Sequence, residues 1–375
     1  MEKLQILIAI DSLVMGGIQK SMLTLIHYMK DICEMDVLVW HKREPEALQL
    51  PDYVNRIHVP GTESVRSAFS IYGISKELGY SCLSVVRKKR WLVLPRLEKQ
   101  YDVAIAYSHV SSLKYYLIDK VSAKRKYAFY HHGSYDYDGI IKCFDAEYYP
   151  KYMKVFAVSD FAKSVLAKAL PDLTNVSVLP NLLDIEHIKK SAEEPCPEFP
   201  DDSRLKLLTV GRLSREKNPL EIAETAMLLE NCGIYYIWIV VGDGDLFNDL
   251  AAAIDSNGLT GKVVMTGNQL NPYRFMKKCD VYLQFSKFEA DPLTVKEAAI
   301  FNKHMVLSNI PGFRDLQTIL HNIYLFDDRD DIIRIFMGIR GKTPEINNLY
   351  SSNEIVFQQI KEKLLYDSMQ ETACN

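Results

Sequence analysis

The sequence predicts an α/β protein made of two Rossmann-like domains. Three observations support this class: apolar, β-rich runs alternate with helical patterns, an acidic proline-rich segment divides the series, and the chain has 375 residues. A single core rarely serves so long a chain, because domains average about 150 residues. A content of 48% hydrophobic and 25% charged residues excludes a disordered chain, a collagen and a coiled coil.

The apolar runs are continuous rather than strictly alternating, which is typical of strands covered on both faces. Strands that alternate with helices form parallel sheets through right-handed crossovers. Helices are expected after Gly16-Gly17 and after Asn218-Pro219, where a proline fits the first helical turn. The predicted strands are residues 4–10, 36–40, 103–107, 127–131, 155–158, 176–179, 206–210, 235–241, 263–265, 281–285 and 305–307.

Residues 191–203 interrupt this alternation. Their sequence, SAEEPCPEFPDDS, contains three prolines and five acidic residues, a composition typical of a linker. We therefore predict a first domain over 1–185, a linker over 186–204 and a second domain over 205–354. The amphipathic segment 355–375 is expected to pack back on the first domain.

Charge and cysteine content limit the classes of function. The 45 Lys+Arg and 48 Asp+Glu give a net charge of −3, which argues against a nucleic-acid-binding surface. The seven cysteines are scattered, so we expect reduced thiols in a cytoplasmic protein. The first apolar run is too short for a signal peptide, and no run reaches the roughly 18 residues of a membrane span. A soluble or peripheral protein is expected.

Two loops carry groups suited to a diphosphate. Gly16-Gly17 follows the first predicted strand and precedes a helix, where backbone amides can approach an anion. Gly211 ends a later strand, and Arg212 and Lys217 follow it at the sheet edge where open α/β folds bind ligands. The alternatives are a tight packing turn for the glycines and solvated surface cations for the second loop.

Two carboxylates lie eight residues apart at the third loop. Glu289 falls in the loop and Glu297 about two turns into the helix that Pro292 opens, so they are not neighbours on one helix face. One can therefore face a ligand at the helix entrance while the other reaches its far end. The alternative is a helix with ordinary solvated acids.

These segments together resemble the retaining glycosyltransferases of family 4, which have the GT-B fold of two Rossmann-like domains facing each other across a cleft. The resemblance covers most of the chain and is strongest over about 155–312. The matching segments, in the order of the family, are the Gly16-Gly17 loop, AVSDFAKSVL (157–166), VLPNLLD (178–184), VGRLSREKNP (210–219), GDGDLFNDL (242–250) and EADPLTVKEA (289–298).

The resemblance implies a role for each group. Arg212 and Lys217 would neutralise the departing diphosphate, Glu297 would bind the ribose hydroxyls, and Glu289 would lie near the transferred sugar. The nucleobase would be held by residues 267–273. The implied donor-binding residues are Gly16, Gly17, Gly211, Arg212, Lys217, Asn268, Glu289, Asp291, Pro292, Leu293, Thr294 and Glu297.

The resemblance also implies a histidine at the end of a first-domain strand, which would contact the donor sugar. His131 and His132 both fit, and adjacent residues of a strand face opposite sides, so only one would point into the cleft. His109 is a weaker third candidate. The implied catalytic residues are His131, His132, Glu289, Arg212 and Lys217.

The chain departs from the family pattern at three positions. Gln19 stands where an acid is usual, and Asp291 stands where an aromatic residue is usual, which puts the donor sugar in doubt. Lys296 replaces an apolar residue and is interpreted as part of an exposed helix face. Asp243-Gly244-Asp245 resembles a metal-binding DxD sequence, but it lies in the glycine turn, so we expect neither a metal nor another cofactor.

Residues 87–96 read RKKRWLVLPR, and their cations and Trp91 suit an anionic membrane surface. Peripheral contact through Arg87–Arg90 at the inner face of the cell membrane is one hypothesis, and a solvated basic helix end is the alternative.

The resulting hypothesis is a retaining, metal-independent glycosyltransferase of capsule, exopolysaccharide or other surface-polysaccharide synthesis. Its donor would be a nucleotide diphosphate sugar, with UDP favoured and GDP next, and its acceptor a glycan or lipid-linked glycan. The alternatives are a non-catalytic GT-B partner of another glycosyltransferase and a nucleotide-sugar epimerase. A dehydrogenase is disfavoured, because the GxGxxG fingerprint is absent.

Overall fold

The computed structural model describes residues 3–14, 16–41, 48–59, 89–109, 112–135 and 139–365. The chain divides into two compact units, each discussed by itself. The first unit comprises Met1–Leu182 together with Ile355–Asn375, and the second comprises Leu183–Glu354.

The first unit is built around a parallel sheet that has seven strands in its described part. These are β1 (Leu4–Ile10), β2 (Cys33–Val39), β3 (Asn55–Ile57), β4 (Gln100–Ala106), β5 (Ser122–Tyr130), β6 (Lys154–Ala157) and β7 (Val176–Val178). The spatial order is β3-β2-β1-β4-β5-β6-β7, so the winding direction reverses between β1 and β4.

Helices connect these strands. The amphipathic α1 buries Met22, Leu25 and Ile26 on the face turned to the sheet. The Ser159 side chain caps α6 by accepting the Ala162 amide at 3.0 Å. The helical elements are α1 (Gly17–Met29), η1 (Arg90–Val93), α4 (Leu113–Lys120), α5 (Gly139–Tyr148), η2 (Tyr149–Lys151) and α6 (Asp160–Ala169).

The second unit has a parallel sheet of six strands in the order β10-β9-β8-β11-β12-β13, and its winding reverses between β8 and β11. Its strands are β8 (Leu205–Val210), β9 (Tyr236–Val241), β10 (Val263–Gly267), β11 (Val281–Gln284), β12 (His304–Ser308) and β13 (Ile323–Phe326). Its helices are α7 (Ile185–Ser191), α8 (Glu221–Asn231), α9 (Phe247–Ser256), α10 (Tyr273–Lys278), α11 (Leu293–Ala299), α12 (Pro311–Gln317) and α13 (Arg329–Ile339).

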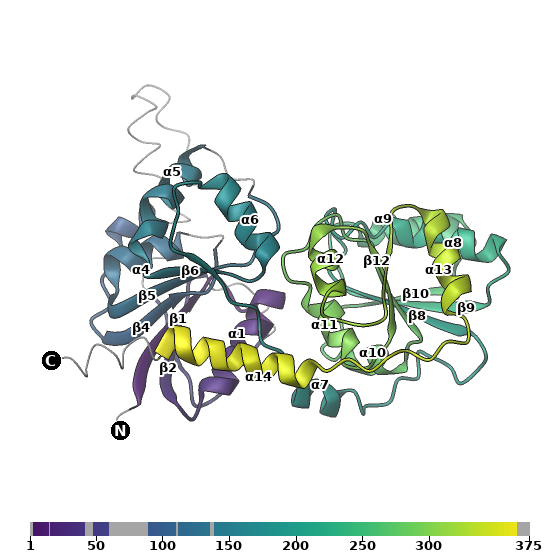
Figure 1. The fold of residues 1–375 in the computed structure, drawn as a ribbon, viewed down its shortest axis with the longest axis horizontal. Helices are drawn as coiled ribbons and strands as arrows, with labels where there is room; N and C mark the ends of the chain where they lie inside the picture. Colours follow the sequence, from purple (N-terminus) through teal and green to yellow (C-terminus); the bar gives the residue numbers. More distant parts are fainter. Residues whose placement is uncertain are drawn as a thin grey trace. The chain divides into compact units, whose positions relative to one another are not determined.

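Helices cover both faces of this second sheet (Figure 1). Successive strand residues point to opposite faces, so Leu207 joins one core and Leu208 the other. Ile222 of α8 and Ile332 of α13 lie in the core of Leu207, whereas Phe275 of α10 lies in the core of Leu208. The continuous apolar strands are thereby explained, and the predicted class, two Rossmann-like halves with parallel sheets, is confirmed.

The segment predicted as a linker differs from that expectation. Residues 191–203 belong to the second unit, where Phe199 is buried in the core. Its acidic side chains pair with basic ones of α10, as in Glu198 with Arg274 at 2.6 Å and Glu193 with Lys277 at 2.6 Å. The prolines and acids therefore mark an irregular segment that is held in place by ion pairs about 80 residues away in the sequence.

The chain returns to the first unit at Ile355, within α14 (Leu349–Ile360), which continues as the π-helical turn η3 (Lys361–Leu365). Phe357 packs edge-on against Tyr28 of α1, with ring centroids 4.9 Å apart. Arg125 donates to the carbonyl of Leu364 at 3.3 Å. The described part of the segment 355–375 is thus packed on the first unit.

Two strands, β3 and β13, were not expected. β3 has the polar sequence NRI, and β13 is a short edge strand beside β12. In the part of the chain that the structure covers, no helix has both the length and the apolar content needed to cross a bilayer.

Candidate functional site

The predicted site residues of the second unit gather at the carboxyl ends of β8 and β11, where the winding of the sheet reverses. Gly211 follows β8 directly, and the segment that contains Glu289 follows β11. Adjacent parallel strands end at the same edge, so these loops meet. This edge is the position at which open α/β sheets bind ligands.

The glycine turn that follows β9 lies against the loop that follows β8. A Cβ atom on Gly242 would stand 1.9 Å from the carbonyl oxygen of Gly211, and one on Gly244 would stand 2.5 Å from that of Leu213. Leu213 also donates its amide to the carbonyl of Asp243 at 2.9 Å. Glycines are needed here because the two backbones touch. The Asp243 carboxylate accepts the Gly244 amide at 2.7 Å and so serves the turn.

Lys217 and Glu289 come together, although 72 residues separate them in the sequence. The Lys217 ammonium forms an ion pair with Glu289 Oε1. The same oxygen accepts the Ser286 hydroxyl at 2.7 Å, and Ser286 accepts the side-chain amide of Gln284 at 3.0 Å. Sequence reasoning gave Gln284 and Ser286 no role. The available signal was two polar residues at the end of an otherwise apolar strand.

Arg212 is exposed, in contrast to the half-buried Lys217. Among the described residues, no carboxylate forms an ion pair with Arg212. Its guanidinium is therefore available to a ligand that approaches this edge of the sheet.

Glu297 is buried on α11, with 4% of its surface exposed. The Tyr273 hydroxyl lies 3.3 Å from its Oε1, and burial, together with the Glu297 charge, raises the pKa of Tyr273. A phenol that keeps its proton can go on donating to the carboxylate. Glu297 is therefore held in one orientation at the middle of a short helix, whereas Glu289 lies in the preceding loop.

Asp291 and Lys296 form an ion pair in which the two side chains are 4% and 12% exposed. The expectation that Lys296 belongs to an exposed helix face is wrong, because its ammonium turns back to the carboxylate that precedes α11. The negative charge of Asp291 is thereby neutralised within the protein. Pro292 is buried, and Leu293 and Thr294 are half-buried in the first turn of α11.

The segment expected to hold a nucleobase begins at Gly267, which has a φ of +67°. Asn268 is exposed directly after it, whereas Tyr273 is buried and engaged with Glu297. The Gly267 carbonyl accepts the Gly242 amide at 2.8 Å, which ties this segment to the glycine turn. The exposed part of the segment is therefore its beginning.

In the first unit, Gly16 is extended with a φ of −172° and precedes Gly17, the first residue of α1. Gln19 reaches back and donates to the carbonyl of Ser12 at 3.1 Å. An amide can make this contact and an acid cannot, so Gln19 closes the loop that precedes the helix.

Three histidines cluster at the carboxyl ends of β4 and β5. β5 ends at Tyr130, so His131 and His132 lie in the loop beyond it, and the rule of opposite strand faces does not decide between them. The His109 ring centroid is 6.4 Å from that of His131 and 5.2 Å from that of His132. His132 Nδ1 lies 3.0 Å from the carbonyl oxygen of Ser134.

His109 is the buried member of this cluster, with 1% of its surface exposed, and neither ring nitrogen has a partner among the described residues. Burial, and then the neighbouring His131 and His132, lower the pKa of His109 well below 6.5. The unfolded chain therefore binds a proton below about pH 6.5 that the folded chain refuses, and stability falls with decreasing pH. We expect His109→Phe to remove up to about 2 kcal/mol of the stability loss between pH 7 and 5.

Chemical denaturation at both pH values measures this difference. His58→Phe, at an exposed histidine of the same unit, is the control and should follow the native chain. Equal acid sensitivity of His109→Phe and the native chain would contradict the prediction.

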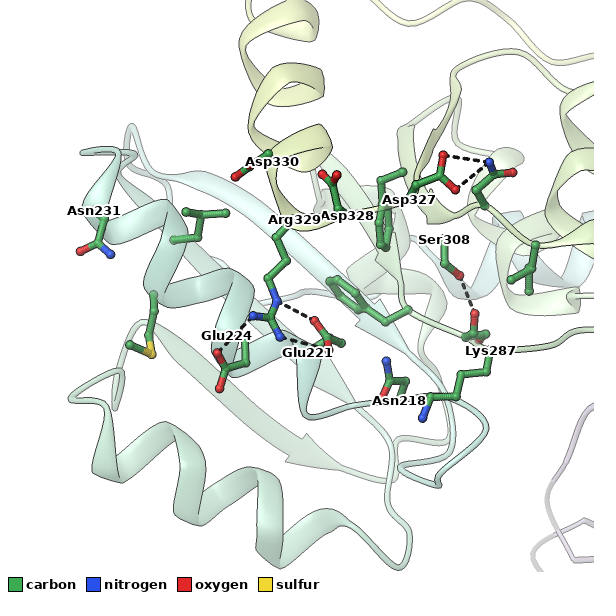
Figure 2. A pocket seen from close by; sticks show the side chains of 17 residues that line it. Asn218, Glu221, Glu224, Asn231, Lys287, Ser308, Asp327, Asp328, Arg329 and Asp330 are labelled. Atoms are coloured by element: carbon green, nitrogen blue, oxygen red, sulfur yellow. Dashed lines mark hydrogen bonds and ion pairs between the residues drawn. The ribbon is translucent and has the colours of Figure 1, made fainter.

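A pocket of about 930 Å³ lies at the same edge of the second sheet, toward β12 and β13 (Figure 2). None of the predicted site residues lines it. Its polar groups engage one another, because Arg329 pairs with Glu221 at 2.8 Å and Asn309 donates to Asp327 at 3.0 Å. These contacts leave the pocket without a clear claim on a ligand.

The basic segment 87–90 is only partly described, because Arg87, Lys88 and the side chain of Arg90 lie outside the described residues. Lys89 pairs with Glu147 at 3.4 Å. Trp91 is fully buried, and its indole donates to Asp119 at 2.7 Å. The expectation that Trp91 faces a membrane is therefore wrong.

Two Rossmann-like units, each with its loops at the carboxyl ends of parallel strands, define the class of GT-B proteins. Solved structures confirm this fold. The crystal structure of Anabaena HepE in complex with UDP and glucose is similar over 95% of both chains, with a TM-score of 0.66 and 16% identity. The crystal structure of S. aureus TarM with UDP and two glycan ligands covers 98% of both chains, with a TM-score of 0.64 and 13% identity.

Residues 192–336 match the family described as glycosyl transferases group 1. The chain belongs to this family, which confirms the resemblance seen in the sequence motifs. The match lies wholly within the second unit.

Curated relatives match part of the chain. An Escherichia coli UDP-Gal:alpha-D-GlcNAc-diphosphoundecaprenol alpha-1,3-galactosyltransferase is 28% identical over 48% of this chain and 49% of its own length. A Campylobacter jejuni N-acetylgalactosamine-N,N'-diacetylbacillosaminyl-diphospho-undecaprenol 4-alpha-N-acetylgalactosaminyltransferase is 34% identical over 30% of this chain and 29% of its own length. The chain thus spans about half or less of the curated relatives it matches.

Proposed function

We propose that this protein is a retaining glycosyltransferase that moves a sugar from a nucleotide diphosphate sugar to a glycan or lipid-linked glycan. The observation that carries the proposal is the arrangement at the edge of the second sheet. There Arg212 is exposed, Lys217 touches Glu289, and Glu297 is held beside them on α11. Two cations and two carboxylates suit a ligand with a diphosphate and several hydroxyls.

The cations act on the leaving group. As the bond between the sugar and the diphosphate breaks, negative charge grows on the diphosphate oxygens. Arg212 offers a planar fork and Lys217 a point charge, and fixed charges aimed at a developing charge often make the largest catalytic contribution. This arrangement needs neither a metal ion nor another cofactor, and we propose metal-independent transfer.

The carboxylates act on hydroxyl groups. Glu297 accepts the ribose hydroxyls and Glu289 lies near the transferred sugar. The residues that open α11, Asp291 to Thr294, together with Gly211, Asn268 and the Gly16-Gly17 loop, complete the proposed donor contacts. In the first unit, either His131 or His132 contacts the sugar and stabilises charge during transfer.

The comparisons support the choice of donor and acceptor. The Escherichia coli relative is named for UDP-Gal, and the Anabaena HepE structure contains UDP. Both curated relatives are named for acceptors on diphosphate-linked undecaprenol. We therefore favour UDP over GDP as the nucleotide and a lipid-linked glycan of surface-polysaccharide synthesis as the acceptor.

Thermal denaturation with UDP, GDP, ADP, CMP and NAD, each with and without Mg²⁺, tests the donor site. A ligand at about 100 times its Kd adds about 2.7 kcal/mol of stability. We expect one diphosphate, UDP, to raise the Tm without Mg²⁺. Arg212→Ala should weaken its binding by about tenfold or more, because it removes charge-assisted hydrogen bonds.

Arg215→Ala is the matched control, because Arg215 is an exposed arginine of the same loop. It should bind UDP as the native chain does. Stabilisation by no diphosphate would refute the donor site. With a donor in hand, NMR of the product decides between retention and inversion of the anomeric configuration.

A further inference from the structure

A buried ion pair in the first unit belongs to none of the groups discussed so far. Lys114 of α4 and Asp145 of α5 are 3% and 0% exposed, and their Nζ and Oδ1 atoms are 2.7 Å apart. Removing two charges from water costs more than their attraction usually returns, and apolar pairs of similar volume are often as stable. A stability role alone therefore explains this pair poorly.

Each member of the pair holds one of the two loops that carry the histidine cluster. The Lys114 ammonium donates to the carbonyl oxygen of His109 at 2.8 Å, in the loop that follows β4. Asp145 Oδ2 accepts the hydroxyl of Tyr135 at 2.8 Å, in the loop that follows β5. One ion pair thus connects the ends of two neighbouring strands.

The connection extends to the imidazoles. Tyr135 follows Ser134, whose carbonyl oxygen accepts the Tyr130 hydroxyl at 2.7 Å and lies 3.0 Å from His132 Nδ1. The rings of His109 and His132 then meet at 5.2 Å between centroids. Fixing His109 from one side and Tyr135 from the other therefore fixes how the rings lie.

The other contacts of the pair leave it little freedom. Lys114 Nζ also donates to the hydroxyl of Tyr149 at 3.4 Å. Asp145 Oδ1 also accepts the hydroxyl of Tyr115 at 2.6 Å. The three protons of the ammonium and both carboxylate oxygens are thereby engaged, so neither group can turn without losing a bond. Burial lowers the pKa of Lys114, and the Asp145 charge opposes that shift.

We infer that Lys114, Asp145 and Tyr135 are positioning residues, which hold the His131–His132 loop in its working arrangement. The inference rests on the proposed function for its effect on sugar transfer. Its structural half, that the pair sets the orientation of the imidazoles, stands on the contacts alone.

Two tyrosine substitutions separate this role from a purely structural one. Tyr135→Phe and Tyr115→Phe each remove one phenol from Asp145, but only Tyr135 lies in the histidine loop. Both variants should lose a few degrees of Tm. We expect Tyr135→Phe alone to shift the imidazole NMR signals of His131 and His132 and their titration curves, with assignments from His131→Gln and His132→Gln.

The kinetic expectation follows the same contrast. Tyr135→Phe should lower kcat by about tenfold or more with little change in the donor KM, because a small misplacement of an acting group is costly. Tyr115→Phe should keep the native kcat. Equal shifts of the histidine signals in the two variants, or in neither, would overturn the inference. Shifted signals with an unchanged kcat would overturn the role in transfer.

A double variant tests the ion pair itself. Lys114→Met/Asp145→Leu leaves no unpaired charge in the core and should fold. A folded double variant with native histidine signals would overturn the inference. If the native chain transfers no sugar from any donor, the proposed function fails, and the NMR comparison still decides whether the pair holds the loop.

Discussion

Glu289→Gln is expected to lose sugar transfer while binding UDP more tightly than the native chain does. In the free protein the Lys217 ammonium is engaged by Glu289, so a diphosphate must compete with this carboxylate. The amide weakens the competition by about 1 kcal/mol, which corresponds to about fivefold in Kd. Transfer should fall by about a hundredfold, because the sugar loses its positioning contact.

Glu297→Gln is the matched control, since it makes the same chemical change eight residues along. The structure predicts the opposite sign for it, because Glu297 is proposed to accept the ribose hydroxyls, and UDP should bind less tightly. Isothermal titration of UDP and a transfer assay measure both variants. A loss of UDP affinity in Glu289→Gln as large as that in Glu297→Gln would place Glu289 on the nucleotide instead of the sugar.

Gly242→Ala is expected to prevent stable folding of the second unit, with a loss of more than about 4 kcal/mol. The φ of Gly242 is +139°, and its new Cβ would stand 1.9 Å from the carbonyl oxygen of Gly211. Neither backbone can withdraw freely, because Gly211 donates to Val241 at 3.0 Å and Gly242 donates to Gly267 at 2.8 Å. The methyl group must therefore break the ends of adjacent strands apart.

Gly258→Ala separates strain from collision. Gly258 also has a positive φ, of +66°, but no atom lies within 4 Å of the position of its Cβ. This substitution should cost only about 1 kcal/mol, from the backbone conformation alone. Urea denaturation of both variants makes the comparison, and similar losses would contradict the collision argument.

The fold was largely predictable because it follows from local patterns. Runs such as 206–210 and 235–241 are apolar at every position, and only strands covered on both faces need that. β13 shows where this reasoning fails. It is a four-residue edge strand with half-buried positions, so its pattern is weak, and its partner β12 lies 15 or more residues earlier.

The failures have a common physical cause: charges that find partners far away in the sequence. The acids of 191–203 read as solvated, yet Glu198 and Glu193 pair with cations of α10. Lys296 reads as exposed, yet it pairs with Asp291. A sequence shows that a side chain is charged, but the tertiary fold decides whether an opposite charge is within reach.

The same limit applies to the candidate site. Arg212, Lys217, Glu289 and Glu297 could be selected by residue type and spacing, and whether they bind a donor stays a prediction. The buried pair of Lys114 and Asp145 could not be selected, since a lysine within an aromatic helix sequence gives no sign of burial. Nothing in the sequence links it to a histidine loop, because the contact runs through a backbone carbonyl.

The first unit is assembled from two separate stretches of the chain, and this has a consequence for synthesis on the ribosome. Ile360, Leu364 and Leu365 are buried in the first unit, with exposures of 3%, 0% and 3%. They are made only after the whole second unit. At roughly 5–20 residues per second, the nascent first unit waits on the order of ten to thirty seconds with part of its apolar surface uncovered. During that interval it is a candidate client for chaperones that bind exposed apolar surface.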